Sequence, residues 1–496
     1  MSDFKIDSYA GWENYPRNLH LSSHDVDASR VDDRISRLAK DLFVDKEASN
    51  FRFLELNTPG QDGLREVELV RIQTTEDLSA VFRRSQDTSI FFLDQSYTWS
   101  RLQICEEHFR KLCTYLEVHP DFLAIVYLFC EKVRPVEESF NGFFINYSNQ
   151  QGPGLMSPGF DYSIGYNIKY VSRHGRRSPK DPFSIREVGV YQQLSSGSQT
   201  NSWVILQAPA PLQDRLRRAF GNSNDTAPGQ QFQLHPVILL CVSDDWRDYL
   251  SYLEEDFSLL VDRGFYTNIK GPQFEGDVEA DYSDIRKLQI LTDKLQRLRH
   301  ILSLNVRLGH QMRDSLEKLQ RQQSASLLIG SSHISNKLEK FIYDQQTSSD
   351  RISNLLERST GIGQLVQNIL EIRATEAGKI MNFEMQKLTE QGIEENKLVK
   401  RLTQQATRDT KSMKIIALVS AIFLPATFMA TLFGSNFFVY SQDQNKLTVA
   451  SNFWVYIVFT AGFSGTVITA WVLWKQPRAK RREADDLGPQ LTRQLV

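Results

Sequence analysis

The stretch that decides the fold lies at residues 415–436, which read IIALVSAIFLPATFMATLFGSN. Residues 415–433 carry no charge, and a helix of about 20 apolar residues crosses the hydrocarbon core of a bilayer. A second uncharged stretch, residues 453–474, follows after a short polar connection. The sequence therefore predicts two transmembrane helices near the C-terminal end of the chain, at 414–434 and 453–474.

Basic residues predict the orientation of the two spans. Six lie within residues 397–414 and five within residues 475–482, whereas the connection between the spans holds one, Lys446. Because basic residues near the ends of spans stay on the cytosolic side, we expect both termini to be cytosolic. The loop at 435–452 is then extracytosolic and residues 475–496 form a basic cytosolic tail. The plasma membrane or the vacuolar membrane is the expected location.

Composition and motifs exclude several classes of function. The 496 residues have a formal net charge of −2, which does not favour a nucleic-acid partner. The first twenty residues lack the apolar core of a signal peptide, so we expect the first span to direct insertion. The four cysteines form no C-x-x-C pair and are expected to be reduced core thiols. Since no phosphate-binding loop, nucleophile elbow or H-E-x-x-H motif occurs, we expect no enzyme and no covalently bound cofactor.

The N-terminal half has the pattern of an α/β domain. Apolar alternation and short apolar runs predict strands at 51–56, 66–72, 89–93, 141–147, 162–171, 187–194 and 202–206. Helices are expected over 99–129, with a capping box at Ser100 and Gln103 and a break at His119-Pro120. A loop at 221–230 and a helix over 236–261 follow. We divide this part into an N-terminal extension, 1–45, and a cytosolic domain, 46–272.

A helical stalk or coiled-coil region is predicted at 283–413. Its first helix carries a leucine seam at Leu288, Leu291, Leu295, Leu298 and Leu302. A Gln/Ser-rich stretch, 320–332, interrupts the pattern, and a second helix then continues without a break from 362 to 433. That second helix would be roughly 110 Å long at about 1.5 Å per residue. It either serves oligomerisation alone or carries cytosolic events to the membrane.

Seven residues that recur every three or four positions through the first span share one helix face, which carries all three hydroxyl residues of the uncharged run. They are Thr410, Met413, Ala417, Ser420, Leu424, Thr427 and Thr431. The opposite face is apolar throughout: Ile415, Val419, Ile422, Ala426, Met429 and Phe433. Such a stripe indicates either a watery lumen or ordinary helix packing in which the hydroxyls bond to their own helix. Pro425 breaks one backbone hydrogen bond, which a neighbouring helix or water should satisfy.

The quoted stretch resembles the first membrane segment of CorA-type magnesium transporters in three places: KIIA at 414–417, FLPATF at 423–428 and GSN at 434–436. The order of domains also matches that family. Residues 116–123 and 369–373 resemble segments of the divergent CorA-like proteins of filamentous fungi. The resemblance is specific over about 362–474 and weak over the first two hundred residues.

The resemblance implies a homopentamer in a lipid bilayer that transports Mg²⁺ or another divalent cation. The stripe from Thr410 to Thr431, with Ile416 as an alternative to Ala417, would line the pore, and Met413 and Leu424 would form apolar constrictions. The selectivity filter would be Gly434, Ser435 and Asn436, and Asp443 would lie at the outer mouth.

Two departures from the family pattern raise an alternative. Ser435 replaces the methionine of the family's Gly-Met-Asn signature, and the family's outer Met-Pro-Glu segment is missing. The expected function is a homo-oligomeric divalent-cation channel, and the alternative is a membrane-anchored scaffold or sensor that keeps the architecture without conducting. Regulatory metal sites are not assigned.

Overall fold

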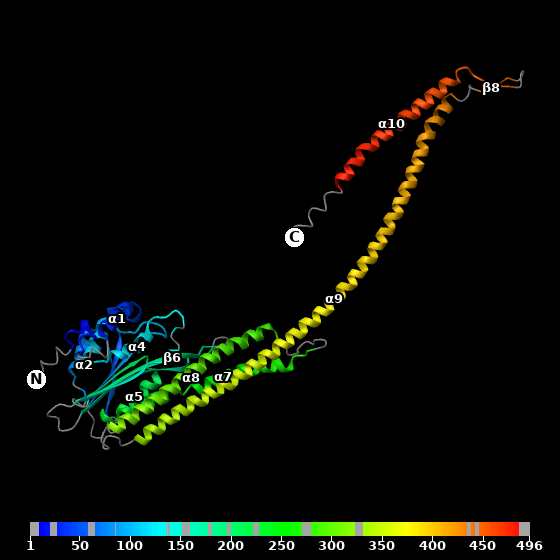
Figure 1. Ribbon diagram of the computed structural model, residues 1–496. Helices are drawn as coiled ribbons and strands as arrows, with labels where there is room; N and C mark the ends of the chain where they lie inside the picture. The colour runs from blue at the N-terminus through cyan, green and yellow to red at the C-terminus, as the bar shows by residue number, and fades with distance from the viewer. Residues whose placement is uncertain are drawn as a thin grey trace. The chain divides into compact units, whose positions relative to one another are not determined.

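The computed structural model describes residues 9–485 except for 20–26, 58–64, 85, 135, 137–138, 151–158, 177–180, 196–199, 222–227, 270–278, 323–330, 434–437 and 442–445. The chain forms two compact units, Met1–Ala374 and Thr375–Val496 (Figure 1). An α/β region comes first, a very long helix follows, and an apolar helix lies near the C-terminus. This order of elements confirms the predicted fold class.

A seven-stranded mixed sheet forms the centre of the first unit. Its strands are β1 (Phe51–Leu56), β2 (Val67–Ile72), β3 (Thr88–Leu93), β4 (Phe143–Gln150), β5 (Gly159–Arg173), β6 (Phe183–Ser195) and β7 (Thr200–Leu206). Their order is β2-β1-β3-β7-β6-β5-β4. The central pair β3–β7 is parallel, and the other neighbouring strands are antiparallel. All seven predicted strands are confirmed, and β5 and β6 are longer than predicted.

Helices surround the sheet, and several were not predicted. The α-helices are α1 (Ala28–Leu42), α2 (Thr75–Arg83), α3 (Glu106–Tyr115), α4 (Leu123–Val126), α5 (Ala210–Gly221), α6 (Leu234–Val242) and α7 (Trp246–Tyr266). Short 3-10 helices are η2 (Trp12–Asn14), η3 (Lys46–Ala48), η4 (Pro120–Phe122), η5 (Tyr127–Phe129) and η6 (Pro228–Gln233). Sequence analysis missed α1, α2 and α5. The predicted helix at 236–261 is two helices, because the chain leaves the helical path after Val242.

The prediction of a helix starting at residue 99 is wrong. Helix α3 begins at Glu106, where the Cys105 sulfur caps the helix by accepting the His108 N–H. The Ser100 hydroxyl instead accepts the Tyr97 N–H, and the Gln103 N–H donates to the Asp94 carbonyl. These bonds hold residues 97–103 as a loop beside the end of β3. The predicted break at His119-Pro120 is confirmed, because η4 begins there.

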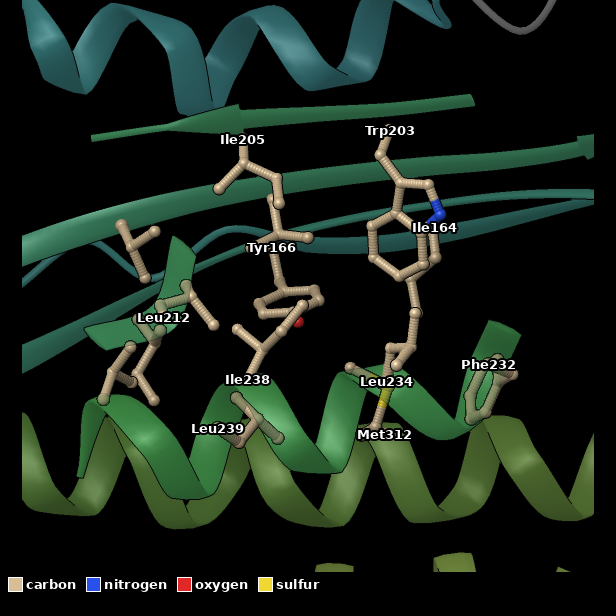
Figure 2. Close-up of a cluster of buried hydrophobic side chains, with 14 of the residues drawn as sticks. Ile164, Tyr166, Trp203, Ile205, Leu212, Phe232, Leu234, Ile238, Leu239 and Met312 are labelled. Carbon is tan, nitrogen blue, oxygen red and sulfur yellow. The ribbon is translucent and has the colours of Figure 1, made fainter. Parts of the chain in front are cut away.

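Strand residues alternate between two buried faces, so the sheet is the middle of three layers. On one face, Trp203 and Tyr166 point toward the side chains of α5, α6 and a later helix, α8 (Tyr282–Gln322), as Figure 2 shows. On the other face, neighbouring residues such as Val204 pack with α1, α2, α3 and α4. The sequence analysis treated residues 1–45 as an extension separate from the domain at 46–272. In the structure, Tyr15 and Ile35 from this segment belong to the second core.

A chain of buried polar side chains crosses the first core. The His235 ring bonds through Nδ1 to the Tyr166 hydroxyl at 3.1 Å and through Nε2 to the Gln192 amide oxygen at 2.5 Å. The Gln192 amide then donates to Asn201 at 3.2 Å. Burial lowers the pKa of His235 to about 3, so the ring stays neutral. Because each of these side chains has a hydrogen-bond partner, the network fixes α6 against β5, β6 and β7.

The predicted leucine seam is confirmed as buried, but its partners lie in the same chain. Helix α8 (Tyr282–Gln322) packs its seam against α7 and the first part of α9 (Ser331–Phe433). Gly309 allows a close approach between α8 and α9, since a Cβ there would lie 2.6 Å from Ile342. A hydrogen bond of 3.0 Å between Thr292 and Ser359 also joins these two helices. The seam therefore builds a three-helix bundle within one protomer.

Helix α9 continues from the bundle into the second unit without interruption. Its 103 residues correspond to roughly 150 Å at about 1.5 Å per residue. This confirms the predicted continuity through 362–433. The hairpin β8 (Phe438–Ser441) and β9 (Lys446–Val449) follows, and α10 (Phe453–Asp485) completes the unit.

Two helices of the described chain are long and apolar enough to cross a membrane, at Ser332–Phe428 and Phe453–Leu473. Only 6% of the apolar window of the first is buried, and none of the second is. A core helix of a soluble protein would be mostly buried. By length, composition and low burial, both helices therefore fit the two predicted transmembrane segments.

Candidate pore segment

The stripe predicted on the first span lies on one regular helix. At about 100° per residue, Thr410 to Thr431 occupy an arc of roughly 100° on α9. Met413 and Leu424 are 70% and 68% exposed in the single chain. Ser420, Thr427 and Thr431 are exposed as well. The residues of the stripe therefore share one face that is open to a partner or to solvent.

Threonines of the stripe donate to carbonyls of their own helix. The Thr410 hydroxyl bonds to the Ala406 carbonyl at 2.6 Å, and the Thr431 hydroxyl bonds to Phe428 at 2.8 Å. Thr427 bonds to Phe423 at 3.0 Å. A hydroxyl that donates its hydrogen to a carbonyl of its own helix can act toward other groups only as a hydrogen-bond acceptor. The stripe thus presents oxygen acceptors, which suit cations and water.

Helix α10 packs on a flank of α9 and leaves most of the stripe uncovered. A cavity of about 360 Å³ between the helices is lined by Leu424, Pro425 and Phe428 of α9 and by Phe463 and Val467 of α10. This contact face is turned by about 60° from the middle of the stripe at about 100° per residue. Leu424 is shared by the two faces. In one protomer the hydroxyl residues of the stripe remain available to neighbouring copies.

The backbone break at Pro425 is accompanied by a bond from the neighbouring helix. Proline lacks the N–H that would reach the Ala421 carbonyl, four residues earlier. The Tyr456 hydroxyl of α10 donates to the Ala426 carbonyl at 3.3 Å. This donor comes from the neighbouring helix but reaches Ala426 rather than Ala421, so the prediction that a neighbouring helix or water satisfies the broken bond stays a prediction. This bond fixes α10 beside the proline.

The residues predicted to form the filter and the outer mouth, Gly434, Ser435, Asn436 and Asp443, lie outside the described residues. They remain predictions. The described elements on either side are the end of α9 at Phe433 and the hairpin β8–β9. Sequence analysis missed this hairpin, although the aromatic and β-branched residues of 437–440 and 446–449 are its signal.

Metal ligands do not cluster within the described part of one protomer, where no group of three His, Cys, Asp or Glu side chains is placed to hold an ion. Cys105 and Cys113 are buried as free thiols, and Cys130 and Cys241 are partly buried. Burial raises the pKa of the Cys113 thiol. The thiols thus have the character of reduced core residues, as the sequence predicted.

The geometry defines a membrane protein with a large α/β unit joined by one helix to two spans. The family model of CorA-like transporters matches residues 7–263, and the chain belongs to this family. The match covers the α/β unit, where the residue resemblance was weakest, and not the membrane segments. Evidence for the family and evidence for the spans therefore come from different parts of the chain.

The solved structures that match the chain have low sequence identity and low TM-scores. One is the CorA magnesium transporter of Methanocaldococcus jannaschii, with 13% identity, a TM-score of 0.35 and coverage of 85% of this chain and 96% of that one. The full-length CmaX protein has 12% identity, a TM-score of 0.34 and coverage of 87% and 99%. The cytoplasmic domain of ZntB from Vibrio parahaemolyticus has 12% identity, a TM-score of 0.34 and coverage of 66% and 99%.

No curated protein matches the chain by sequence. The family assignment rests on the family model alone.

Proposed function

We propose that the protein is a homo-oligomeric channel for divalent cations, with Mg²⁺ as the first candidate. One observation carries the proposal. A single unbroken helix, α9, joins an α/β unit of the CorA-like transporter family to a span whose small and hydroxyl-bearing stripe α10 leaves exposed. A stripe of this kind suits a water-filled lumen as well as close helix packing, and the CorA-like family of the α/β unit favours the lumen.

The proposed pore uses the stripe and the filter in different ways. Asn436 would place a ring of amide oxygens around an ion that keeps its water shell, which Mg²⁺ gives up reluctantly. Met413 and Leu424 would narrow the lumen with apolar side chains and close it by excluding water. Asp443 would raise the local concentration of cations at the outer mouth.

Exposed apolar side chains on α9 support self-association. Beyond the bundle, Ile380, Phe383 and Leu388 are 66%, 67% and 65% exposed. A second copy packed along α9 would cover these side chains and remove their apolar surface from water. Five copies around a central axis, with the α/β units and both termini in the cytosol, would bury this surface and direct the stripes toward a common lumen.

The alternative is a scaffold or sensor that does not conduct. The bonds from Thr427 and Thr431 back to their own helix favour it, because hydroxyls satisfied in this way also occur in spans that merely pack. Divalent-cation flux into liposomes that contain the purified protein distinguishes the two functions. Flux above that of protein-free liposomes supports the channel, and an intact oligomer without flux supports the scaffold.

Cysteine accessibility tests the pore face. Thr427→Cys is expected to react faster with a small water-soluble thiol reagent than Ile422→Cys, because only the first would face a lumen. Both side chains are exposed in one protomer, so the difference arises only in the assembly. The measurement is the rate of modification in membranes, in a background that carries Cys130→Ser and Cys241→Ser. Equal rates would favour ordinary helix packing over a pore.

Glycosylation tests the orientation. The native sequons at Asn146 and Asn224 are expected to carry no glycan, because both would be cytosolic. An acceptor sequon introduced near Gln442 is expected to be modified, since the connection between the spans would face outward. Gel mobility before and after deglycosylation gives the result. A glycan on either native asparagine would reverse the proposed orientation.

A further inference from the structure

A cavity of about 280 Å³ opens in the first unit, far along the chain from the pore segment. Strand β6, helices α7 and α8, the loop that contains Trp99 and the loop after η5 all contribute to its wall. Exposed side chains at its rim, such as Trp99 at 38% and Val136 at 52%, connect it to solvent. Its residues come from widely separated parts of the sequence.

Positive charge exceeds negative charge in the wall, where five basic and two acidic side chains meet. Both acids are already satisfied. Asp181 accepts from the Phe183 N–H at 2.9 Å, the Tyr249 hydroxyl at 3.2 Å and Lys294 Nζ at 2.8 Å. Glu187 pairs with Lys169 at 3.1 Å. The cavity therefore keeps a net positive charge that its own carboxylates do not neutralise.

Two of the basic side chains, Arg186 and Lys132, make no ion pair with any described residue. The Nε atom of Arg186 is buried and has no hydrogen-bond partner among the described residues. A buried donor without a partner costs about 1–3 kcal/mol, and more when it is charged. Arg186 therefore keeps a positive charge in the wall that no described carboxylate neutralises.

Strained backbone lies at the same cavity. Trp99 and Gln207 have φ values of 78° and 55°, a region that bulky residues rarely adopt. Such strain persists where the surroundings enforce it, often at ligand sites. The Gln207 side chain accepts the Gln95 N–H at 2.5 Å, and the Gln95 amide donates to the Phe129 carbonyl at 3.0 Å. These bonds hold the loop that places the Trp99 indole in the wall.

We propose that this cavity binds a small molecule that carries a phosphate group and a flat ring, of the size of a nucleoside monophosphate. Arg186 and Lys132 bind the phosphate, because guanidinium and ammonium donors form strong charge-assisted bonds to it. The exposed indole of Trp99 stacks on the ring. A volume of about 280 Å³ lies just below the range of about 300–1,000 Å³ for ligand sites, which disfavours dinucleotides.

The position of the cavity relates it to the stalk. Lys294 and Arg297, which line it, belong to α8. On the same helix, Leu295 is fully buried in the bundle, and Thr292 bonds to Ser359 of α9. A bound ligand would thus lie between the sheet and a helix that packs directly on α9. Ligand binding to the cavity does not require that the protein transports cations. A negative result for the cavity would therefore leave the channel proposal standing, and the reverse also holds.

The test is calorimetric titration of the full-length protein in detergent with AMP, adenosine and inorganic phosphate. AMP is expected to bind more tightly than either fragment. Arg186→Gln is expected to weaken AMP binding by about tenfold or more, the usual effect of losing a charge-assisted hydrogen bond. Trp99→Gly is expected to weaken AMP to the level of phosphate, and glycine accepts the left-handed backbone without strain.

The matched control is Arg71→Gln, an exposed arginine on β2 remote in sequence from the cavity residues, which should leave AMP binding unchanged. Circular dichroism and thermal unfolding verify that each variant is folded, and Lys132→Gln replaces Arg186→Gln if the latter does not fold. Absence of AMP binding, or equal binding by wild type and the cavity variants, would overturn the proposal. Phosphate binding as tight as AMP binding would overturn the role of Trp99.

Discussion

Asn436→Ala is expected to reduce divalent-cation flux to the level of protein-free liposomes. The substitution removes the proposed ring of amide oxygens that orders the water shell of the ion. It leaves both spans and the bundle unchanged, so membrane insertion and oligomer size should persist. The measurement is Mg²⁺ uptake into liposomes, with the oligomer checked by size-exclusion chromatography in mild detergent.

Ser435→Met is the second variant of this experiment, because it restores the methionine of the family's Gly-Met-Asn signature. Mg²⁺ flux is expected to rise if the native triplet conducts weakly. If wild type, Asn436→Ala and Ser435→Met all show no flux while assembling normally, the channel proposal fails and the scaffold replaces it. Loss of the oligomer in Asn436→Ala would instead show that this residue serves assembly.

Arg110→Met is expected to destabilise the α/β unit by about 3–5 kcal/mol, the cost of removing one partner of a buried ion pair. The Arg110 side chain is only 6% exposed and pairs with Asp32 and Glu106, each at 2.9 Å. It also donates to the Tyr15 carbonyl at 2.7 Å and to the Ser36 hydroxyl at 3.2 Å. One side chain therefore joins η2, α1 and α3. The free energy of unfolding, from urea titration followed by circular dichroism, measures the loss.

Arg17→Met is the matched control, because Arg17 contacts the same carboxylate. Its Nε lies 2.9 Å from Asp32, but its side chain is 47% exposed. An exposed pair contributes about 0–1 kcal/mol, so this variant should unfold close to wild type. Similar losses in both variants would show that burial does not set the strength of the Asp32 contacts.

The strands were predictable because burial leaves a period of two in the sequence. In β1, Phe51 and Phe53 face one core while Leu54 joins the other. Arg52 lies between the two phenylalanines, and Glu55 lies between Leu54 and Leu56. The bounds of β1 match the prediction at both ends. Long, regular segments such as α9 were predictable for the same reason, since their period of 3.6 persists over many turns.

The missed helices left signals that the sequence analysis did not use. In α1, Val31, Ile35, Leu38 and Leu42 recur every three or four positions, and Ile35 and Leu42 are buried. Helix α2 has nine residues, but its capping box at Thr74 and Asp77 was visible in the sequence. Tertiary contacts rather than local pattern decided the segment at 97–103, where Ser100 joins a loop instead of a helix.

The two candidate sites differ in how far the sequence predicts them. The stripe on α9 comes from one helix, so spacing alone identifies it. The basic cavity combines Trp99, Lys132, Arg186, Tyr249 and Lys294 from separate elements. No local pattern connects such positions, and only the folded sheet and bundle bring them together.

The unbroken course of α9 has a consequence for evolution as well as for signalling. Between the last buried turn of the bundle and the first span, a single inserted residue would rotate everything beyond it by about 100°. A seven-residue insertion would change the phase by only about 20°. Insertions or deletions between residues 375 and 410 should therefore be tolerated in steps of seven residues and rejected in steps of one. Only steps of seven keep the stripe of the first span at nearly the same angle relative to the buried face of the bundle.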